Sequence, residues 1–309
     1  TAYKTYTENQ LFSPEISTTT GYSKLYVNAG KVTNKGIELA LGFKQNIGPV
    51  DWKTTLLWSL NRNRIDQLLP EYTNEELGVT VHLDEMDVYS LGGAKQRLTV
   101  GGSMGDVYVN TMRTDEHGHI WMNSMTGTLE TDKNNYVYAG NTNPKYTLSW
   151  RNEFNWKGIS LGFMLNARVG GIGVSATQAV MDYYGVSKTS AEARDNGGVK
   201  VNGQMIDAQT WYQTIGANGT GYVGSMYVYS MTNVRLGELT LGYDIPINKW
   251  CKWISGLNVS FVGRNLWMLY CKAPFDPEST ASTGTYNQGM DYFMQPSLRS
   301  MGFSAKISF

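Results

Sequence analysis

The residues with the clearest capacity for chemistry are two histidines and a run of carboxylates. His117 and His119 have the spacing of two metal ligands, but neither a cysteine nor a third histidine nearby completes a zinc site. Asp84, Glu85 and Asp87 lack the spacing and the glycine of a calcium-binding loop. We interpret both groups as polar loop segments. The sequence therefore predicts no metal site and no cofactor.

Catalysis is not predicted either. Asp276 and Glu278 have the residue types of a glycosidase pair, but nothing fixes a partner for them, and we interpret them as turn or loop-packing groups. The glycine-rich segment 101–105 (GGSMG) lacks the Lys-Ser/Thr of a phosphate-binding loop. The expected set of catalytic residues is therefore empty, and the chain is predicted not to be an enzyme.

Ligand contact is the better-supported role. An aromatic ring can stack on a sugar or hold a peptide side chain, because it buries apolar area while its polar atom stays wet. The candidate contact residues are Trp121, Tyr183, Tyr184, Trp211, Tyr212, Arg168 and Arg264. The alternative is that the aromatic residues pack loops together. Arg62 and Arg64 are expected on the same inward face as Arg168 and Arg264. As a group, these arginines could instead pair with wall carboxylates such as Glu38 and Glu153.

The composition favours strands and turns. The 309 residues include 34 glycines, 20 tyrosines and 9 tryptophans, which suit pleated surfaces and bends. Twenty-six basic residues balance 26 acidic ones, so no charge footprint for nucleic acid is present. No apolar run reaches the about 18 residues of a membrane helix. Cys251 and Cys271 flank a predicted strand, too far apart for a disulfide, so we expect two free thiols.

Eight segments alternate between apolar and polar residues, as strands with one apolar face do. They are residues 1–10, 28–47, 51–61, 145–155, 159–169, 231–244, 257–267 and 301–309. The last one ends on Phe309, and a terminal aromatic residue is typical of the closing strand of an outer-membrane barrel. A change of phase between Leu236 and Leu239 predicts a β-bulge. Short helices are expected at 187–194 and 207–214, and short strands at 96–100 and 105–109.

The connections between these strands alternate in length. Residues 48–50, 156–158 and 245–254 are short, whereas 62–144, 170–230 and 270–295 are long. Outer-membrane barrels have short periplasmic turns and long extracellular loops. The pattern predicts an all-β fold, namely a transmembrane antiparallel β-barrel with long extracellular loops and a periplasmic C-terminus. Aromatic residues expected near the periplasmic boundary are Trp52, Trp156, Tyr243, Trp250 and Trp253.

A family resemblance adds to this pattern. Residues 34–39 (NKGIEL), Trp52 and residues 61–65 (NRNRI) resemble a stretch of the SusC/RagA family, which are TonB-dependent transporters of the Bacteroidetes outer membrane. Further matches follow in the family's order: 101–108 (GGSMGDVY), 140–146 (GNTNPKY), 156–161 (WKGISL), 234–246 (VRLGELTLGYDIP), 263–266 (GRNL), 276–278 (DPE) and the terminal Phe309.

The resemblance implies a fold, partners and a function. The family's barrel has about 22 strands, so residues 1–309 would be its C-terminal portion, without the plug domain and the TonB box. Import of oligosaccharides or peptides with a SusD-like surface lipoprotein is implied, with the TonB complex acting through the absent N-terminal part. The resemblance is also compatible with a dimer of transporter–lipoprotein pairs. Residues 140–144 (GNTNP) depart from the family's GNPxP, which leaves the choice of substrate in doubt.

Two alternatives remain at this point. One is a self-closed eight-stranded outer-membrane barrel that acts as an adhesin or a structural protein. Such a barrel encloses only side chains, and the small inward residues here would underfill it. The other is a soluble carbohydrate-active β protein. Pairing between the first and last strands distinguishes the first alternative from a barrel fragment, in which Phe309 would be an assembly signal.

Overall fold

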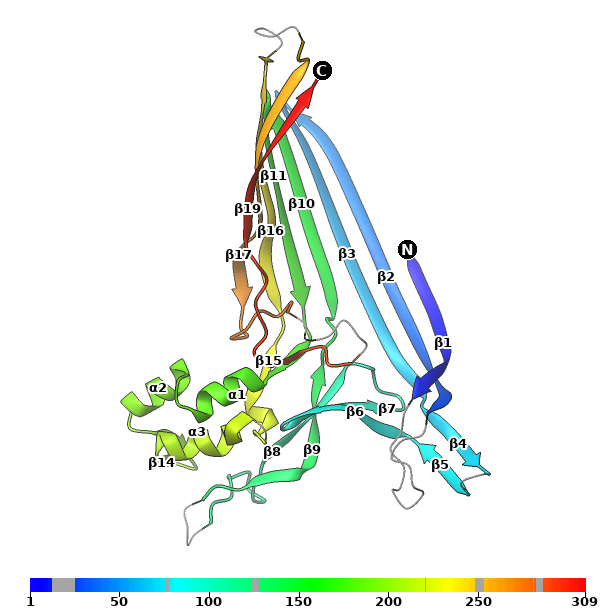
Figure 1. Ribbon diagram of the computed structural model, residues 1–309, viewed down its shortest axis with the longest axis vertical. Helices are drawn as coiled ribbons and strands as arrows, with labels where there is room; N and C mark the ends of the chain where they lie inside the picture. The colour runs from blue at the N-terminus through cyan, green and yellow to red at the C-terminus, as the bar shows by residue number, and fades with distance from the viewer. Residues whose placement is uncertain are drawn as a thin grey trace.

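The computed structural model describes residues 1–12, 26–75, 78–123, 128–219, 221–247, 253–279, 281 and 286–309. Its main element is one eight-stranded antiparallel sheet, so the predicted all-β fold is confirmed. The strands run along the long axis of the molecule (Figure 1). In sheet order they are β1 (Ala2–Phe12), β2 (Val27–Ile47), β3 (Val50–Gln67), β10 (Tyr146–Trp156), β11 (Ile159–Val169), β16 (Asn233–Ile245), β17 (Gly256–Cys271) and β19 (Ser300–Ser308).

One face of this sheet is apolar from β2 to β19. Directly paired residues of neighbouring strands stand on the same face, and the pairing joins Leu41 to Leu56, Leu56 to Trp150, and Trp150 to Leu165. Many of these side chains are exposed, Leu41 by 54%. A contiguous exposed apolar surface of this kind is typical of the lipid-facing side of a barrel wall.

The opposite face of the sheet is polar. One row of direct partners joins Ser59 to Thr147, Thr147 to Arg168, and Arg168 to Asn233. The alternation along each strand therefore sorts the side chains into a lipid-compatible surface and a hydrophilic interior surface.

Two polar side chains interrupt the apolar face and satisfy tryptophan N–H groups. Trp52 Nε1 donates to Asn152 Oδ1 at 3.2 Å, and Trp150 Nε1 donates to Thr54 Oγ1 at 2.9 Å. We expect Trp52→Phe to leave the buried Asn152 without its donor and to lower the free energy of unfolding by about 1–3 kcal/mol. Adding Asn152→Leu should recover most of the loss. Denaturant unfolding of the refolded barrel in micelles measures both, and a Trp52→Phe barrel as stable as the wild type would contradict this account.

The short connections gather at one end of the sheet, together with the C-terminus (Figure 1). Residues 48–49 join β2 to β3, and residues 157–158 join β10 to β11. In the second turn Lys157 has φ 47° and Gly158 has φ 83°, the positive values of a two-residue hairpin turn. The predicted bulge is confirmed at Gly237, which is skipped where Leu165 pairs with Leu236 and Met164 with Glu238.

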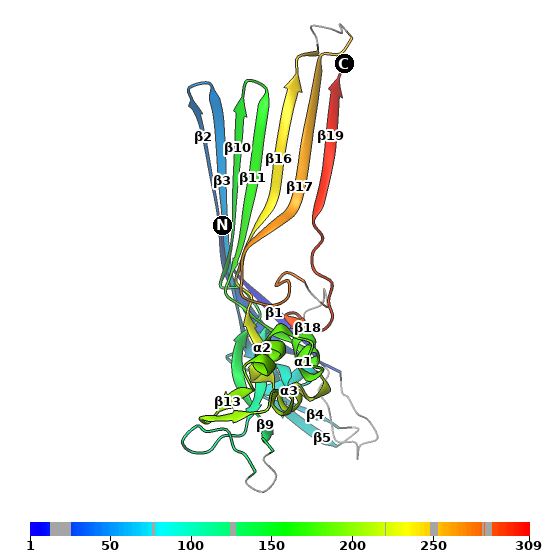
Figure 2. The ribbon, with the colours of Figure 1, turned by 90° about the vertical axis from the view of Figure 1, so that its left-hand side faces the viewer.

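The long connections fold together at the other end, where most of the buried core lies (Figure 2). Their strands are β4 (Leu69–Asn74), β5 (Val79–Leu83), β6 (Glu85–Leu91), β7 (Ala94–Thr99), β8 (Asp106–Met112), β9 (Thr131–Asn141), β12 (Ile172–Ser175), β13 (Val199–Val201), β14 (Gln204–Ile206), β15 (Val228–Ser230) and β18 (Met290–Asp291). Their helices are α1 (Ala176–Tyr183), α2 (Lys188–Asp195) and α3 (Ala208–Gly216), with 3₁₀ turns at Ala217–Gly219 and Gly224–Tyr227. The predicted segments 187–194 and 207–214 correspond to α2 and α3. The sequence did not predict α1, which begins after Ser175, whose side chain accepts from the amide of Gln178 at 3.0 Å.

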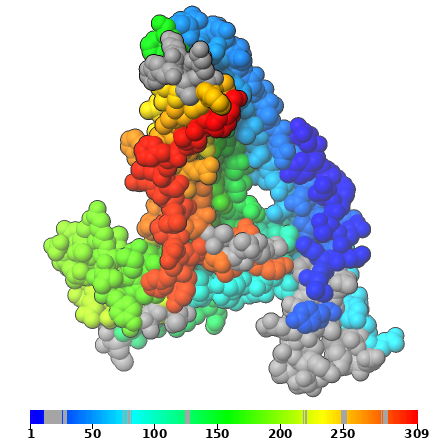
Figure 3. All heavy atoms as spheres, turned by 45° about the horizontal axis from the view of Figure 1, so that its top comes forward, coloured from blue at the N-terminus to red at the C-terminus, as the bar shows by residue number. Residues whose placement is uncertain are grey.

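The sheet is open. β1 pairs only with β2 and β19 pairs only with β17 among the described strands, and Figure 3 shows the two edge strands apart with the sheet receding between them. The chain alone is therefore not a self-closed eight-stranded barrel. Within the described residues, no helix is long and apolar enough to cross a membrane. Cys271 is a free thiol, whereas Cys251 and Trp250 lie outside the described residues.

Candidate functional site

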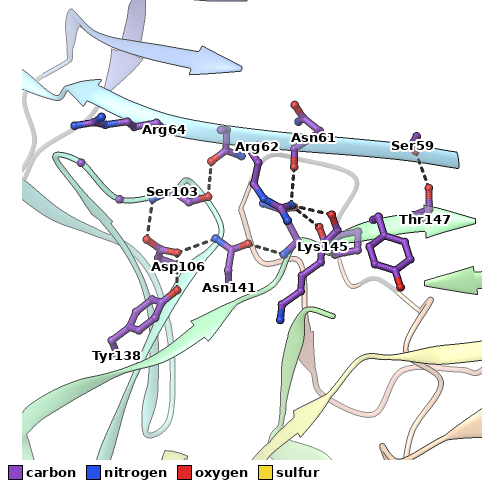
Figure 4. Close-up of a pocket in the computed structure, with 16 residues that line it drawn as sticks. Ser59, Asn61, Arg62, Arg64, Ser103, Asp106, Tyr138, Asn141, Lys145 and Thr147 are labelled. Carbon is purple, nitrogen blue, oxygen red and sulfur yellow. Dashed lines mark hydrogen bonds between the residues drawn. The ribbon is translucent and has the colours of Figure 1, made fainter. Parts of the chain in front are cut away.

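A hollow of about 680 Å³ lies where the eight-stranded sheet, which we call the wall, meets the folded loops. It is lined by the end of β3, by the connection between β7 and β8, and by the segment that links β9 to β10 (Figure 4). Three of the sequence motifs, at 61–65, 101–108 and 140–146, thus meet at one place although up to about 80 residues separate them. Polar side chains make up most of the lining.

Asn63 fastens the β7–β8 connection to the wall. Its Oδ1 accepts from the Ser103 hydroxyl and from the Met104 amide at 3.0 Å. Beside it, Ile65 exchanges backbone hydrogen bonds with the same segment, donating to Gly102 O at 2.9 Å and accepting from Gly101 N at 2.8 Å. The connection therefore extends the β3 edge and is held at a fixed height in the hollow.

Asp106 is the hydrogen-bonding centre of the site. Its carboxylate accepts from Ser103 N at 2.7 Å, from Asn141 Nδ2 at 2.7 Å and from the Tyr138 hydroxyl at 3.4 Å. Asn141 Oδ1 in turn accepts from Asn143 N at 2.7 Å. Burial first, and then the charge of Asp106, raise the pKa of Tyr138, so the phenol stays a donor. A buried carboxylate with several donors rigidifies its surroundings.

One cation at the edge of the hollow, Arg62, is held by backbone oxygens. Arg62 Nη1 donates to Lys145 O at 2.9 Å and to Pro144 O at 3.4 Å, which closes the gap between β3 and the start of β10. The chemistry on offer here is hydrogen bonding and charge, which suits binding of a polar ligand. Among the described residues, no cluster of His, Cys, Asp or Glu could hold a metal ion.

A second junction ties the last long loop to the wall. Arg235 on β16 donates from Nη2 to Asp276 Oδ1 at 2.7 Å, and its Nε lies 3.3 Å from Glu278 Oε1. Asp276 also accepts from the amides of Glu278 at 3.0 Å and Ser297 at 2.9 Å. Two more sequence motifs, at 234–246 and 276–278, therefore meet through a buried ion pair. Here Asp276 and Glu278 pack a loop.

The Asp276 carboxylate predicts a pH dependence of loop docking. Burial raises its pKa, but its hydrogen bonds from Ser297, Glu278 and Arg235 outweigh burial and lower the pKa to about 2 from the ordinary 3.8. Because the pKa is lowered in the folded state, the ionised carboxylate stabilises the docked loop at pH values above 3.8. This stabilisation is lost as the pH falls towards 2. We expect the docked loop to lose about 2 kcal/mol of stability between pH 5 and pH 2. Hydrogen exchange at the Ser297 amide checks this, and in Asp276→Asn the dependence should disappear.

The aromatic candidates gather in the folded loops, outside the lining of the hollow. Trp211 is 8% exposed and packs in the loop core, and Tyr212 is half-buried beside it. Tyr183 and Tyr184 meet edge to face at 5.1 Å, with Tyr184 exposed. Arg113 stands 4.7 Å from the centre of the Trp121 ring. Trp211 thus has the loop-packing role that was the alternative for this group.

The candidate arginines lie on the polar face. Arg168 Nη2 donates to Thr142 O at 2.7 Å, and Arg264 lies 3.8 Å from Glu238. Among the wall carboxylates, Glu153 pairs with Arg151 at 2.7 Å and with Lys53 at 3.8 Å, and not with the arginines first considered. The charges of the polar face are therefore matched chiefly within one strand or between neighbours.

The expected inward face of Arg62 and Arg64 is wrong, although both residues border the hollow. Arg62 pairs directly with Lys35, and Arg64 with Thr33, in the regular continuation of the β2–β3 ladder. This places both arginines on the face of Ile37 and Leu60. The sequence prediction ended the strand at Asn61, but β3 continues to Gln67, and an unbroken two-residue period fixes the outward face.

Sequence reasoning did not single out Asn63, Asp106 and Asn141 as functional residues. The three residues lie in family-like motifs of the sequence. Only the fold shows that these motifs are joined by hydrogen bonds between their side chains and backbone (Figure 4).

Comparison with known proteins agrees with the wall geometry. No family model matches the chain. TonB-dependent receptor P3 of Formosa agariphila is 23% identical over 99% of this chain and 32% of that protein. TonB-dependent receptor P26 of the same organism is 22% identical over 98% of this chain and 32% of that protein.

Solved structures show the same fold. The RagAB peptide transporter superimposes with a TM-score of 0.67 at 16% identity, over 98% of this chain and 32% of that chain. The RagAB peptide importer in its open-open state gives 0.61 at 16% identity, over 100% of this chain and 32% of that chain. The fold is thus that of a barrel wall. The chain is similar to the C-terminal part of a SusC/RagA-like transporter, which confirms the resemblance, and it spans about a third of the length of its relatives.

Proposed function

We propose that this chain forms part of the barrel wall and the extracellular loops of an outer-membrane, TonB-dependent importer of large nutrients. The observation that carries the proposal is the sheet itself. One face is apolar from β2 to β19, the other is polar, and all long connections fold at the end opposite the short turns. Such a wall separates lipid from a hydrophilic passage.

The partners follow from the same proposal. The looped end would face outward and meet a SusD-like lipoprotein, and the C-terminus would lie on the periplasmic side. The TonB complex would act through parts of the protein outside this chain. The substrate would be an oligosaccharide or a peptide, and the likeness to a structure named as a peptide transporter favours the peptide. The hollow around Asn63 and Asp106 would contact it from the wall, with Arg168, Arg264, Trp121, Tyr183, Tyr184 and Tyr212 as further candidates.

A pair of neighbouring substitutions tests the import function. Thr147 lines the hollow from the polar side, whereas Leu148 points to the apolar side. In the whole transporter, Thr147→Trp should reduce uptake of labelled peptides at least tenfold at equal membrane levels, and Leu148→Trp should leave uptake near the wild type. Unchanged uptake in Thr147→Trp, or recovery of the whole protein in the soluble fraction, would overturn the proposal. Parallel uptake of labelled oligosaccharides separates the two substrate classes.

Phe309 is proposed as the assembly signal of the closing strand. β19 pairs with β17 through Ser308, next to the terminal residue, and Phe309 is 90% exposed at the end of the apolar face. We expect Phe309→Ser to lower the amount of whole transporter in the outer membrane severalfold while the transport per folded molecule stays near normal. Quantitative blotting of membrane fractions checks this. Normal membrane levels of the variant would refute the role.

A further inference from the structure

Three cations form one row across β1, β2 and β3 on the outward face. Lys4 pairs directly with Lys35, and Lys35 pairs directly with Arg62. Direct partners in an antiparallel sheet share a face, with Cβ atoms about 4.5–5.5 Å apart. Ile37 and Leu60, two residues away along β2 and β3, are direct partners at the edge of the apolar surface. The cation row (Lys4, Lys35 and Arg62) therefore borders the lipid-facing surface.

No carboxylate among the described residues neutralises the cation row. Within the described part of the chain, none of its three members lies within 4.0 Å of an acidic oxygen. The nearest ion pairs lie beyond it: Lys31 with Glu8 at 2.7 Å, and Arg64 with Asp66 at 3.8 Å. Like charges directly opposite each other destabilise a sheet. The row therefore fits an anion that the described part of this chain does not supply.

A second lysine pair in the same two strands shows the contrast. Lys44 and Lys53 are also direct partners, but they lie on the polar face towards the short turns. There Glu153 stands 3.8 Å from Lys53 and supplies a counter-charge. The missing counter-charge is thus particular to the outward row.

Local contacts leave donors of the row available. Lys35 is exposed. Lys4 lies 4.7 Å from the centre of the Tyr6 ring, a contact that orients its ammonium group without neutralising it. Arg62 uses only Nη1 for the carbonyls of its own and the neighbouring strand, and its other nitrogens have no partner among the described residues.

The cation row lies at the level of the lipid headgroups along the membrane normal. Along β2 the apolar surface runs from Ile37 to Ile47, which is about 33 Å at roughly 3.3 Å per residue. With a strand tilt of about 40°, this spans the ~25 Å apolar band of an outer-membrane barrel. Lys35 lies two residues beyond Ile37, roughly 5 Å above the band, on the side of the folded loops.

We propose that the cation row binds the phosphate of a lipid headgroup in the leaflet on the loop side of the membrane. Two ammonium groups and one guanidinium group at the boundary of an apolar surface suit a phosphate monoester whose acyl chains lie against Ile37 and Leu60. The inference rests on the proposed membrane location, but Lys4 and Lys35, the two residues that the test changes, lie outside the lining of the hollow, which only Arg62 of the row borders.

Native mass spectrometry of the whole transporter in phosphatidylcholine nanodiscs that contain lipid A tests the proposal. Wild type should retain phosphorylated lipid A in preference to the same lipid after phosphatase treatment. Lys4→Gln with Lys35→Gln should weaken this retention roughly tenfold or more. The matched control, Lys44→Gln with Lys53→Gln, removes the same charge from the polar face and should retain lipid A as the wild type does.

The outcomes separate this inference from the proposed function. A protein that does not enter nanodiscs refutes the membrane location and the inference with it. A protein that inserts but holds both forms of lipid A equally, or whose Lys4→Gln/Lys35→Gln variant retains lipid A unchanged, overturns the inference alone. If that variant fails to fold, wild-type retention is followed as salt is raised. A phosphate contact should weaken with ionic strength, and salt-independent retention would overturn the proposal.

Discussion

Arg235→Ala should detach the last long loop from the wall and lower the free energy of unfolding by about 3–5 kcal/mol. Arg235 and Asp276 have side chains only 5% and 9% exposed. Removing the guanidinium leaves a buried carboxylate without its cation, with the Ser297 side chain and the amides of Glu278 and Ser297 as donors. A buried charge without its partner is costly because water cannot replace that partner. Limited proteolysis of the loop and denaturant unfolding of the whole barrel measure the loss.

A neighbouring pair provides the control for this substitution. Arg264 lies 3.8 Å from Glu238 on the same two strands, but its side chain is 67% exposed. Arg264→Ala should therefore cost less than about 1 kcal/mol. If both variants lose the same stability, burial of the Arg235–Asp276 pair is not what holds the loop.

Asp106→Ala should release the β7–β8 connection from the hollow and cost about 2–4 kcal/mol, because several donors to a buried charged group lose their acceptor at once. The amide of Ser103, Asn141 Nδ2 and the Tyr138 hydroxyl all depend on it. Uptake of the labelled substrate should fall with the loss of order. Hydrogen exchange at the Ser103 amide, together with the uptake assay on the whole transporter, checks both effects.

An exposed aspartate supplies the matched comparison. Asp115 accepts from the amides of His117 at 2.9 Å and His119 at 2.8 Å, in a turn open to solvent. Water replaces these bonds at little cost, so Asp115→Ala should change stability by less than about 1 kcal/mol and leave uptake unchanged. Equal effects of the two substitutions would show that Asp106 has no special role in the hollow.

Local pattern was enough to predict the wall. Alternation placed all eight strands within a few residues, and the phase change after Leu236 predicted the bulge at Gly237. Both follow from the two-residue period of a strand and the strict sorting of side chains between lipid and water. The same reasoning put Arg62 and Arg64 on the wrong face, because the predicted strand ended at Asn61, and only the pairing with β2 shows that β3 continues to Gln67.

The loops required the tertiary structure. Helix α1 has a weak local signal and is stabilised by packing against α3, and Trp211 looked like a contact residue until its burial was seen. By itself the sequence determined the strands, their two faces, the alternation of short and long connections and the family-like motifs. Only the fold decided that Asn63, Asp106 and Asn141 surround one hollow and that Arg235 meets Asp276. Such contacts join residues 35 to 41 positions apart, and no period in the sequence records which distant residues come together.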